Sequence, residues 1–101
     1  MASLASIVVL NYNGRHLLGE CLDAVLRQTY PNREVIVVDN GSTDGSQDFV
    51  REKFPSFRLL QLPANIGPAG GHNLGIKTAQ GIEGYFEVDN KAVEELKDRL
   101  L

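Results

Sequence analysis

The apolar residues of this chain follow two spacings that alternate along its length. Residues 6–10 and 35–38 are β-branched or aliphatic almost without polar interruption, which is the pattern of strands buried on both faces of a parallel sheet. After the first run, apolar residues recur every three or four positions, which predicts a helix that carries Leu17, Leu18, Cys21, Leu22, Val25 and Leu26. The start of the chain therefore predicts a strand, a turn-forming loop and a helix.

The same order recurs after the second apolar run. A second helix is predicted to follow residues 42–44, where Ser42 or Thr43 offers a cap. A third strand is predicted at residues 58–62 because Pro63 ends its apolar pattern.

The last part of the chain repeats the unit more weakly. A third helix is predicted from about residue 72 to residue 80, with Gly81 as its stop. Residues 85–88 predict a fourth strand, and residues 91–101 have the spacing of a final amphipathic helix.

Strands and helices that alternate at this spacing require right-handed crossovers. We therefore predict an α/β fold of the Rossmann-like, three-layer sandwich type, with a four-stranded, mainly parallel sheet in the order 3-2-1-4 and helices on both faces. The point where the strand order reverses then lies between strands one and four. The loops there would bring Tyr12, Asp39 and Asp89 toward one crevice at the carboxyl ends of the strands.

Length and charge narrow the class of protein. The 101 residues predict a single domain, 1–101, and a net charge of −3 without a basic stripe argues against a nucleic-acid partner. The apolar runs are too short to cross a bilayer, and the first residues lack a secretory leader pattern, so a cytoplasmic location is expected. Cys21 lies on the apolar side of the first predicted helix and is expected to be a core thiol.

The segment 34–45 is the most informative part of the sequence. Its aliphatic run stops abruptly at Asp39, and Asn40, Gly41, Ser42 and Thr43 then favour a turn. Ligands of parallel α/β sheets bind outside the carboxyl ends of the strands, so Asp39 is a candidate ligand-binding residue. The alternative is a strand-end carboxylate that caps the following turn.

Four separate blocks of the chain carry a family resemblance. They read SIVVLNYNG at 6–14, QTYP at 28–31, VVDNGSTDGS at 37–46 and NIGPAGGHNLGI at 65–76. In this order they resemble the amino-terminal, nucleotide-binding half of family 2 glycosyltransferases, which have the GT-A fold. The resemblance covers roughly residues 6–81 and implies a GT-A half-domain that binds a nucleotide-diphosphate sugar.

The resemblance implies roles for residues at the ends of the first two strands. Asp39 would accept a hydrogen bond from the imide N–H of uracil or thymine, as a carboxylate can. Tyr12 would lie against the base, with plugging of the top of the core as its alternative role, and the backbone of Leu10 would also contact the base.

The glycine-rich segment is implied to approach the ribose and diphosphate. Its candidate binding residues are Asn65, Gly71, His72 and Asn73. Glycines allow a close approach of the backbone, and free amide donors suit phosphate. The segment has neither the dinucleotide fingerprint nor P-loop spacing, so a plain loop is its alternative interpretation. A structural role is the alternative for His72, because a lone histidine is more often structural.

Asp89 stands where the family carries an Asp-x-Asp signature that holds a divalent cation at the diphosphate. Here the chain departs from the pattern: Asp89-Asn90-Lys91 has a cation in the third position, and Glu87-Val88-Asp89 shifts the register into the strand. The resemblance thus implies Asp89 as a ligand of Mn²⁺ or Mg²⁺ in a weakened site.

Family catalytic domains are about twice as long as this chain, and their second half supplies the acceptor site and the catalytic base. The expected function is therefore to bind a UDP- or dTDP-sugar for transfer to a glycan or polysaccharide acceptor, with no catalytic residue assigned and no transfer by the isolated chain. The alternative is a truncated or engineered folding or assembly module without ligand. A homodimer through the edge of strand four or the last helix is also expected, because exposed strand edges pair.

Overall fold

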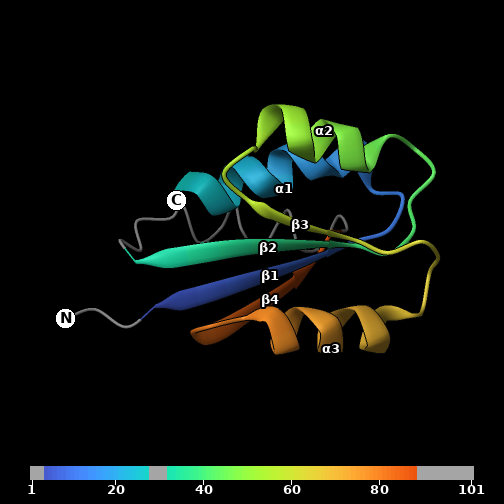
Figure 1. Ribbon diagram of the computed structural model, residues 1–101. Coiled ribbons are helices and arrows are strands. Elements are labelled where there is room, and N and C mark those ends of the chain that lie inside the picture. The colour runs from blue at the N-terminus through green and yellow to red at the C-terminus, as the bar shows by residue number, and fades with distance from the viewer. Residues whose placement is uncertain (1–3, 28–31, 89–101) are drawn as a thin grey trace.

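The computed structural model describes residues 4–27 and 32–88 of the chain. Strands and helices alternate throughout these residues (Figure 1). In chain order they are β1 (Ala5–Asn11), α1 (Arg15–Arg27), β2 (Arg33–Asp39), α2 (Ser46–Lys53), β3 (Arg58–Gln61), α3 (Pro68–Thr78) and β4 (Ile82–Glu87). The helix predicted at 91–101 and the candidate residue Asp89 lie outside the described residues.

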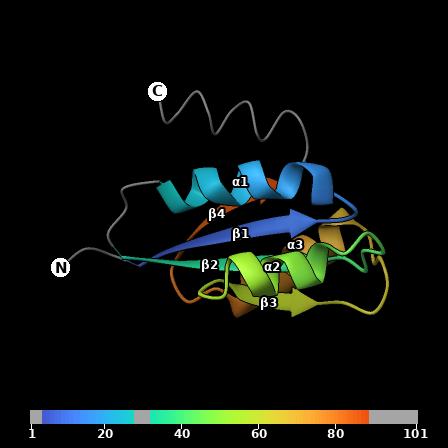
Figure 2. The same cartoon turned by 90° about the horizontal axis from the view of Figure 1, so that it is seen from above.

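The strands form one sheet with the order β3-β2-β1-β4, as predicted. Each neighbouring pair is parallel, and Asn11 pairs with Asp39 at the carboxyl ends of β1 and β2. Helices α1 and α2 cover one face of the sheet and α3 covers the other, so the described part of the chain has three layers (Figures 1 and 2). The α/β sandwich fold is therefore confirmed.

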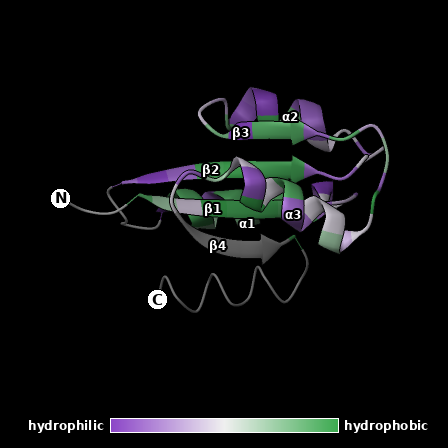
Figure 3. Ribbon diagram, turned by 60° about the horizontal axis from the view of Figure 1, so that its bottom comes forward, coloured by the Kyte–Doolittle hydropathy of each residue, from purple (hydrophilic) through white to green (hydrophobic). Residues whose placement is uncertain are grey.

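Side chains that alternate along β1 and β2 make two apolar clusters, one on each face. Val9 and Val37 belong to the larger cluster, which includes buried residues of α1 and α2. Val8 and Val38 belong to the smaller cluster, against which Leu74 of α3 packs. Burial on both faces explains the continuous apolar runs of these strands (Figure 3). Cys21 is fully buried in the larger cluster, as expected of a core thiol.

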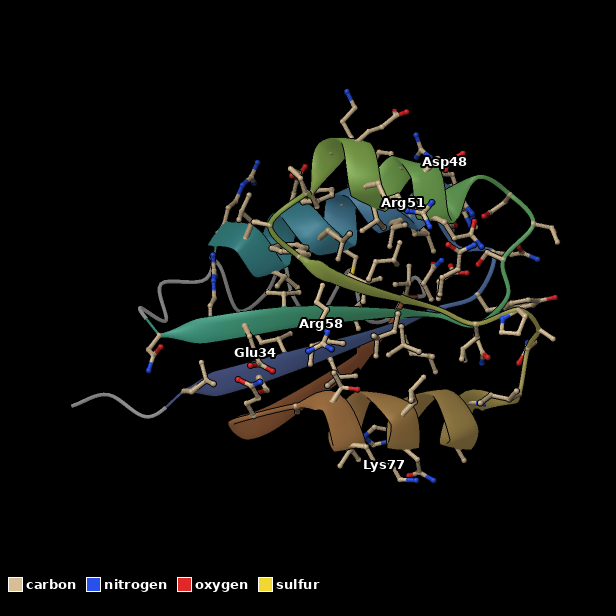
Figure 4. The ribbon with its side chains drawn as sticks, in the orientation of Figure 1. Glu34, Asp48, Arg51, Arg58 and Lys77 are labelled. Carbon is tan, nitrogen blue, oxygen red and sulfur yellow. The ribbon has the colours of Figure 1, made fainter. Side chains whose placement is uncertain are left out.

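Helix α3 begins at Pro68, four residues before the predicted start. The prediction was wrong because Gly70 and Gly71 suggested a loop. The structure shows another use for glycine: a Cβ atom on Gly71 would lie 2.5 Å from Leu10 Cδ1, and one on Gly75 would lie 2.3 Å from Val8 Cγ1. These glycines therefore let α3 approach the sheet closely, while Lys77 points away from it (Figure 4).

Other element ends also differ from the sequence-based predictions. Gly45, with φ of 85°, is the N-cap of α2, and neither Ser42 nor Thr43 caps the helix with a side-chain hydrogen bond. Helix α3 ends at Thr78, before Gly81, because Ala79 leaves the helical conformation, and β4 begins at Ile82 rather than residue 85. Among the described residues, no helix has the length and apolar character that a membrane span requires.

Candidate functional site

A cavity of about 230 Å³ opens at the carboxyl ends of the strands. Its described lining comes from the ends of β1, β2 and β4, from the segment before α3 and from the first residue of that helix, and consists of Leu10, Tyr12, Asn40, Asn65, Pro68 and Val88. Leu10, Tyr12 and Asn65 were candidate binding residues, so the fold brings three predicted residues from two distant segments together. Asn40, Pro68 and Val88 were not predicted.

Tyr12 lines the cavity and is also open to solvent. The residue is 50% exposed, which favours a ligand-facing position over the alternative role as a plug of the core. Beside it, the Leu10 carbonyl accepts a hydrogen bond from the Val88 N–H at 2.9 Å, which continues the β1–β4 pairing to the cavity edge. The site thus has an aromatic face next to an aliphatic wall.

Asp39 is buried below this region and does not line the cavity. Its side chain is 1% exposed. Oδ1 accepts a hydrogen bond from Asn11 Nδ2 at 3.0 Å, and Oδ2 accepts from the Ser42 N–H at 2.9 Å and from Gln47 Nε2 at 2.7 Å. The carboxylate therefore holds the turn after β2, as the alternative role required, although it is buried rather than solvated. Direct base recognition by Asp39 stays a prediction.

Asn11 was not identified from the sequence as a functional residue, yet it joins the two strand ends. Besides its bond to Asp39, Nδ2 donates to Ser42 Oγ at 3.3 Å. Its Oδ1 is buried and lacks a hydrogen-bond partner among the described residues. Gly14 covers this oxygen, since a Cβ atom there would lie only 2.6 Å from it.

Asn40 points to the opposite face of the sheet from Asp39. Its side chain is 1% exposed, Nδ2 donates to the Gly67 carbonyl at 3.0 Å, and Oδ1 accepts from the Ile66 N–H at 2.9 Å. Successive residues of a strand face opposite sides of the sheet. The position of Asn40 directly after Asp39 was therefore the only sequence signal that its side chain would reach the α3 side.

The glycine-rich segment offers fewer free donors than expected. The Gly67 N–H donates to Asn65 Oδ1 at 2.7 Å, and the Ile66 N–H is used by Asn40. Ala69 and Gly70 lie in the first turn of α3, where amide groups have no intrahelical acceptor. These two amides are the better candidates for phosphate donors.

Three further predicted residues lie on α3 and do not line the cavity. Gly71 is buried against Leu10, His72 is partly buried, and Asn73 is exposed. Their roles in binding stay predictions.

Asp44 joins the starts of the first two helices beside this region. It accepts hydrogen bonds from the Arg15 N–H at 2.9 Å, the Ser46 N–H at 3.1 Å and the Ser46 hydroxyl. Partial burial raises the pKa of the carboxyl, but the bonds from Ser46 and Arg15 outweigh it, so the pKa lies below its ordinary value of 3.8. Asp44 is thus a structural anion between two loops.

A metal centre does not form within residues 4–27 and 32–88. No group of three His, Cys, Asp or Glu side chains there is placed to hold an ion. The metal prediction therefore rests on Asp89 alone, outside the described residues.

Sequence comparison places the chain among known proteins. The profile of the family named Glycosyl transferase family 2 matches residues 6–85. Glycosyltransferase GlyG of Streptococcus pneumoniae is 40% identical over 84 residues, which are 80% of this chain and 28% of GlyG. The putative teichuronic acid biosynthesis glycosyltransferase TuaG of Bacillus subtilis is 35% identical over 92 residues, 87% of this chain and 36% of TuaG. The chain thus spans about a third of the length of these relatives.

Solved structures agree with this placement. TarS 1–349 of S. aureus, in complex with UDP-GlcNAc, has a TM-score of 0.77 at 32% identity, over 94% of this chain and 29% of the TarS chain. The mannosyltransferase PcManGT of Pyrobaculum calidifontis, in complex with GDP-Man and Mn²⁺, has a TM-score of 0.70 at 33% identity, over 80% of this chain and 26% of its own.

Proposed function

The chain belongs to glycosyl transferase family 2, and on that premise we propose that it binds a nucleotide-diphosphate sugar in the cavity at the carboxyl ends of β1 and β2. One observation carries the proposal: the fold brings Leu10, Tyr12 and Asn65 to the same cavity from two distant segments. TarS is described in complex with UDP and with UDP-GlcNAc, which favours a uridine nucleotide as the first ligand to test.

The base lies, in this proposal, between Tyr12 and the aliphatic wall. The half-exposed ring of Tyr12 offers a face for stacking, and Leu10 and Val88 offer apolar contact. Asp39 supports this surface through Asn11 and the turn after β2. A direct bond from the base imide to Asp39 would require access to a carboxylate that three protein donors already surround.

The ribose and diphosphate lie toward the start of α3. Pro68 and Asn65 line the cavity there, and the first-turn amides of Ala69 and Gly70 offer donors that suit an anion at a helix N-terminus. His72 and Asn73 follow on the same helix and belong to the proposal as residues that a bound ligand brings into contact.

A divalent cation is a further part of the proposal. PcManGT is described in complex with Mn²⁺, and Asp89 follows β4 by two residues. The described acidic residues do not form a site of their own, so Asp89 would hold the ion with oxygens of the diphosphate. The ion would neutralise charge on the leaving nucleotide.

Transfer of the sugar to a glycan or polysaccharide acceptor requires groups that are absent from the described lining of the cavity. A base near the acceptor hydroxyl must remove its proton. The cavity lining described here holds no carboxylate and no histidine. We therefore propose that the 101-residue chain binds the donor without transferring it.

The test is a titration of UDP-GlcNAc into the chain, followed by amide-resolved NMR. We expect saturable shifts at Leu10, Tyr12 and the segment 65–70, and at least about a tenfold loss of affinity for Tyr12→Ala. Leu26→Ala is the matched control, because Leu26 is 47% exposed and lies at the opposite end of the sheet. A folded chain without saturable shifts would refute the proposal and favour an assembly module. Sugar transfer to any added acceptor would refute the proposed inactivity.

A further inference from the structure

Asn40 is the one polar side chain in the cavity wall that is almost completely buried. It follows β2 directly, its N–H donates to the Asn11 carbonyl at 2.8 Å, and its side chain is 1% exposed. A buried amide is costly unless its donor and acceptor groups are both satisfied. Here both are satisfied by one short segment of backbone.

That segment lies between two residues that line the cavity on the α3 side. Asn40 Oδ1 binds the Ile66 N–H and Nδ2 binds the Gly67 carbonyl, so the amide spans two consecutive residues. The residues on either side of this pair, Asn65 and Pro68, line the cavity. We call the Asn40 amide with its two backbone partners, the Ile66 N–H and the Gly67 carbonyl, the clamp. It fixes the backbone at the point where the loop before α3 passes into the helix.

The clamped backbone also has an unusual conformation. Gly67 has φ of 85° and ψ of 159°, a region open essentially to glycine alone, and no side chain caps α3. The Gly67 carbonyl also accepts the Gly71 N–H at 3.1 Å. Asn40 therefore holds Gly67, the residue whose conformation sets the direction in which α3 begins.

We propose that Asn40 is a positioning residue of the nucleotide site, whose amide holds Ile66 and Gly67 so that Asn65, Pro68 and the first turn of α3 face the ligand. The inference rests on the proposed function for its ligand, but the clamp itself belongs to the protein without ligand. An amide is required because the segment presents one donor and one acceptor.

The Asn40→Asp variant keeps the size of the side chain but changes its hydrogen bonds, so it tests whether Asn40 acts through those bonds or only by filling space. An ionised carboxylate keeps the bond from the Ile66 N–H but faces the Gly67 carbonyl, and two acceptors repel each other. A protonated carboxyl donates to that carbonyl and restores the clamp. Burial and the facing carbonyl should raise the pKa of the introduced carboxyl above the usual value of about 4, so binding becomes pH-dependent.

The wild type already carries titratable side chains on the elements that flank Asn40. His72 lies on α3 and Asp39 precedes Asn40, and both are present in the wild type and in the variant. The comparison between the two proteins therefore isolates the introduced carboxyl. UDP-GlcNAc is the probe, because its diphosphate diester does not titrate over the range used.

The experiment measures UDP-GlcNAc affinity for wild type and Asn40→Asp between about pH 5 and about pH 8, with Ile66 and Gly67 amide shifts recorded in the absence of ligand. We expect the variant to bind about tenfold more weakly at the upper pH and to recover at the lower pH, with both amides shifting at the same midpoint. Gln80→Glu adds the same charge at the opposite end of the sheet and should follow the wild type. Equal affinities at every pH would overturn the proposal.

The clamp can be tested even if the wild type does not bind the probe or the variant does not fold. If the wild type does not bind the probe, the proposed function fails, and the ligand-free shifts of Ile66 and Gly67 still decide whether the clamp exists. If Asn40→Asp does not fold, hydrogen exchange of the wild-type Ile66 amide decides instead. An Ile66 N–H without protection from exchange would overturn the clamp, and a protected one would support it.

Discussion

Asn11 and Asp39 are register partners at the carboxyl ends of neighbouring parallel strands, and their buried side chains are joined by a hydrogen bond of 3.0 Å. Through Ser42 and Gln47, the same carboxylate reaches the turn after β2 and the first turn of α2. One side chain thus ties together two strand ends, a turn and a helix. This accounts for the abrupt change from apolar to polar residues at Asp39.

Replacing Asp39 with asparagine should destabilise the fold. The variant has the same shape but presents an NH₂ group to donors, so it loses at least one charge-assisted bond and leaves a buried donor unpaired. We expect the free energy of unfolding to fall by about 1–3 kcal/mol in urea titrations. Asp23→Asn, on the exposed side of α1, should change it little. A near-neutral Asp39→Asn would show that the network is not structurally important.

Replacing Gly75 with alanine should also destabilise the protein, although alanine favours helix by about 1 kcal/mol. The added Cβ would lie 2.3 Å from Val8 Cγ1, so α3 must move away from the sheet. We expect a net loss of about 1–3 kcal/mol in the free energy of unfolding. Gly70→Ala is the control in the same helix, because its Cβ would meet only the exposed Ile66 side chain at 3.0 Å. Equal stabilities of the two variants would contradict close packing as the reason for Gly75.

Asp44 should contribute stability that depends on pH. Its pKa in the folded protein is lowered, so the carboxylate stabilises the fold at pH above the unfolded value of 3.8, and this contribution is lost as the pH falls through the folded pKa. Because the group is exposed, the contribution should stay below about 1 kcal/mol. Comparison of wild type with Asp44→Asn should show a difference in unfolding free energy at pH 6 that disappears in acid. A difference that grows in acid would contradict this sign.

Mn²⁺ should strengthen UDP-GlcNAc binding if Asp89 holds a cation. We expect a gain of about tenfold or less for the wild type, because the acidic signature is incomplete, and no gain for Asp89→Ala. Calorimetric titrations with Mn²⁺ and with a chelator make the comparison. An equal gain in both proteins would assign the ion to the diphosphate alone.

The homodimer stays a prediction. Strand β4 pairs with β1 on one side, and no strand of the described residues pairs with its other side, which is the edge that the prediction uses. Sedimentation equilibrium should then show a mass that rises with concentration toward twice that of one chain. A single species of monomer mass at about millimolar concentration would refute the prediction.

Much of the architecture could be predicted from the sequence, because the general rules of strand connection apply to a simple alternation of apolar runs and helices. Apolar runs at residues 6–10 and 35–38, each followed by a helix, leave few ways to build a parallel sheet, and the order 3-2-1-4 is confirmed. The same placement put Tyr12 at the carboxyl end of the strands, where the cavity lies.

The details of the site followed from contacts that no local pattern records. Gly70 and Gly71 suggested a loop, but the space between α3 and the sheet is what requires glycine at Gly71. Asp39 was expected to face a ligand, whereas three donors surround it: Ser42 and Gln47 from the turn and helix that follow, and Asn11 from the neighbouring strand. Asn40 was assigned to the turn because its partners, Ile66 and Gly67, lie 26 and 27 residues away.

The side chains of the adjacent residues Asp39 and Asn40 make their hydrogen bonds on opposite faces of the sheet. Asp39 reaches the α2 side and Asn40 the α3 side, because Asp39 ends β2 and Asn40 is the next residue of the chain. Deleting a single residue within β2 would exchange the two faces, turning the carboxylate toward the Gly67 carbonyl and the amide toward Gln47. The length of β2, as well as its composition, is therefore under constraint: a homologous sequence can exchange its buried aliphatic residues only for others of similar volume, and can shorten this strand only in steps of two.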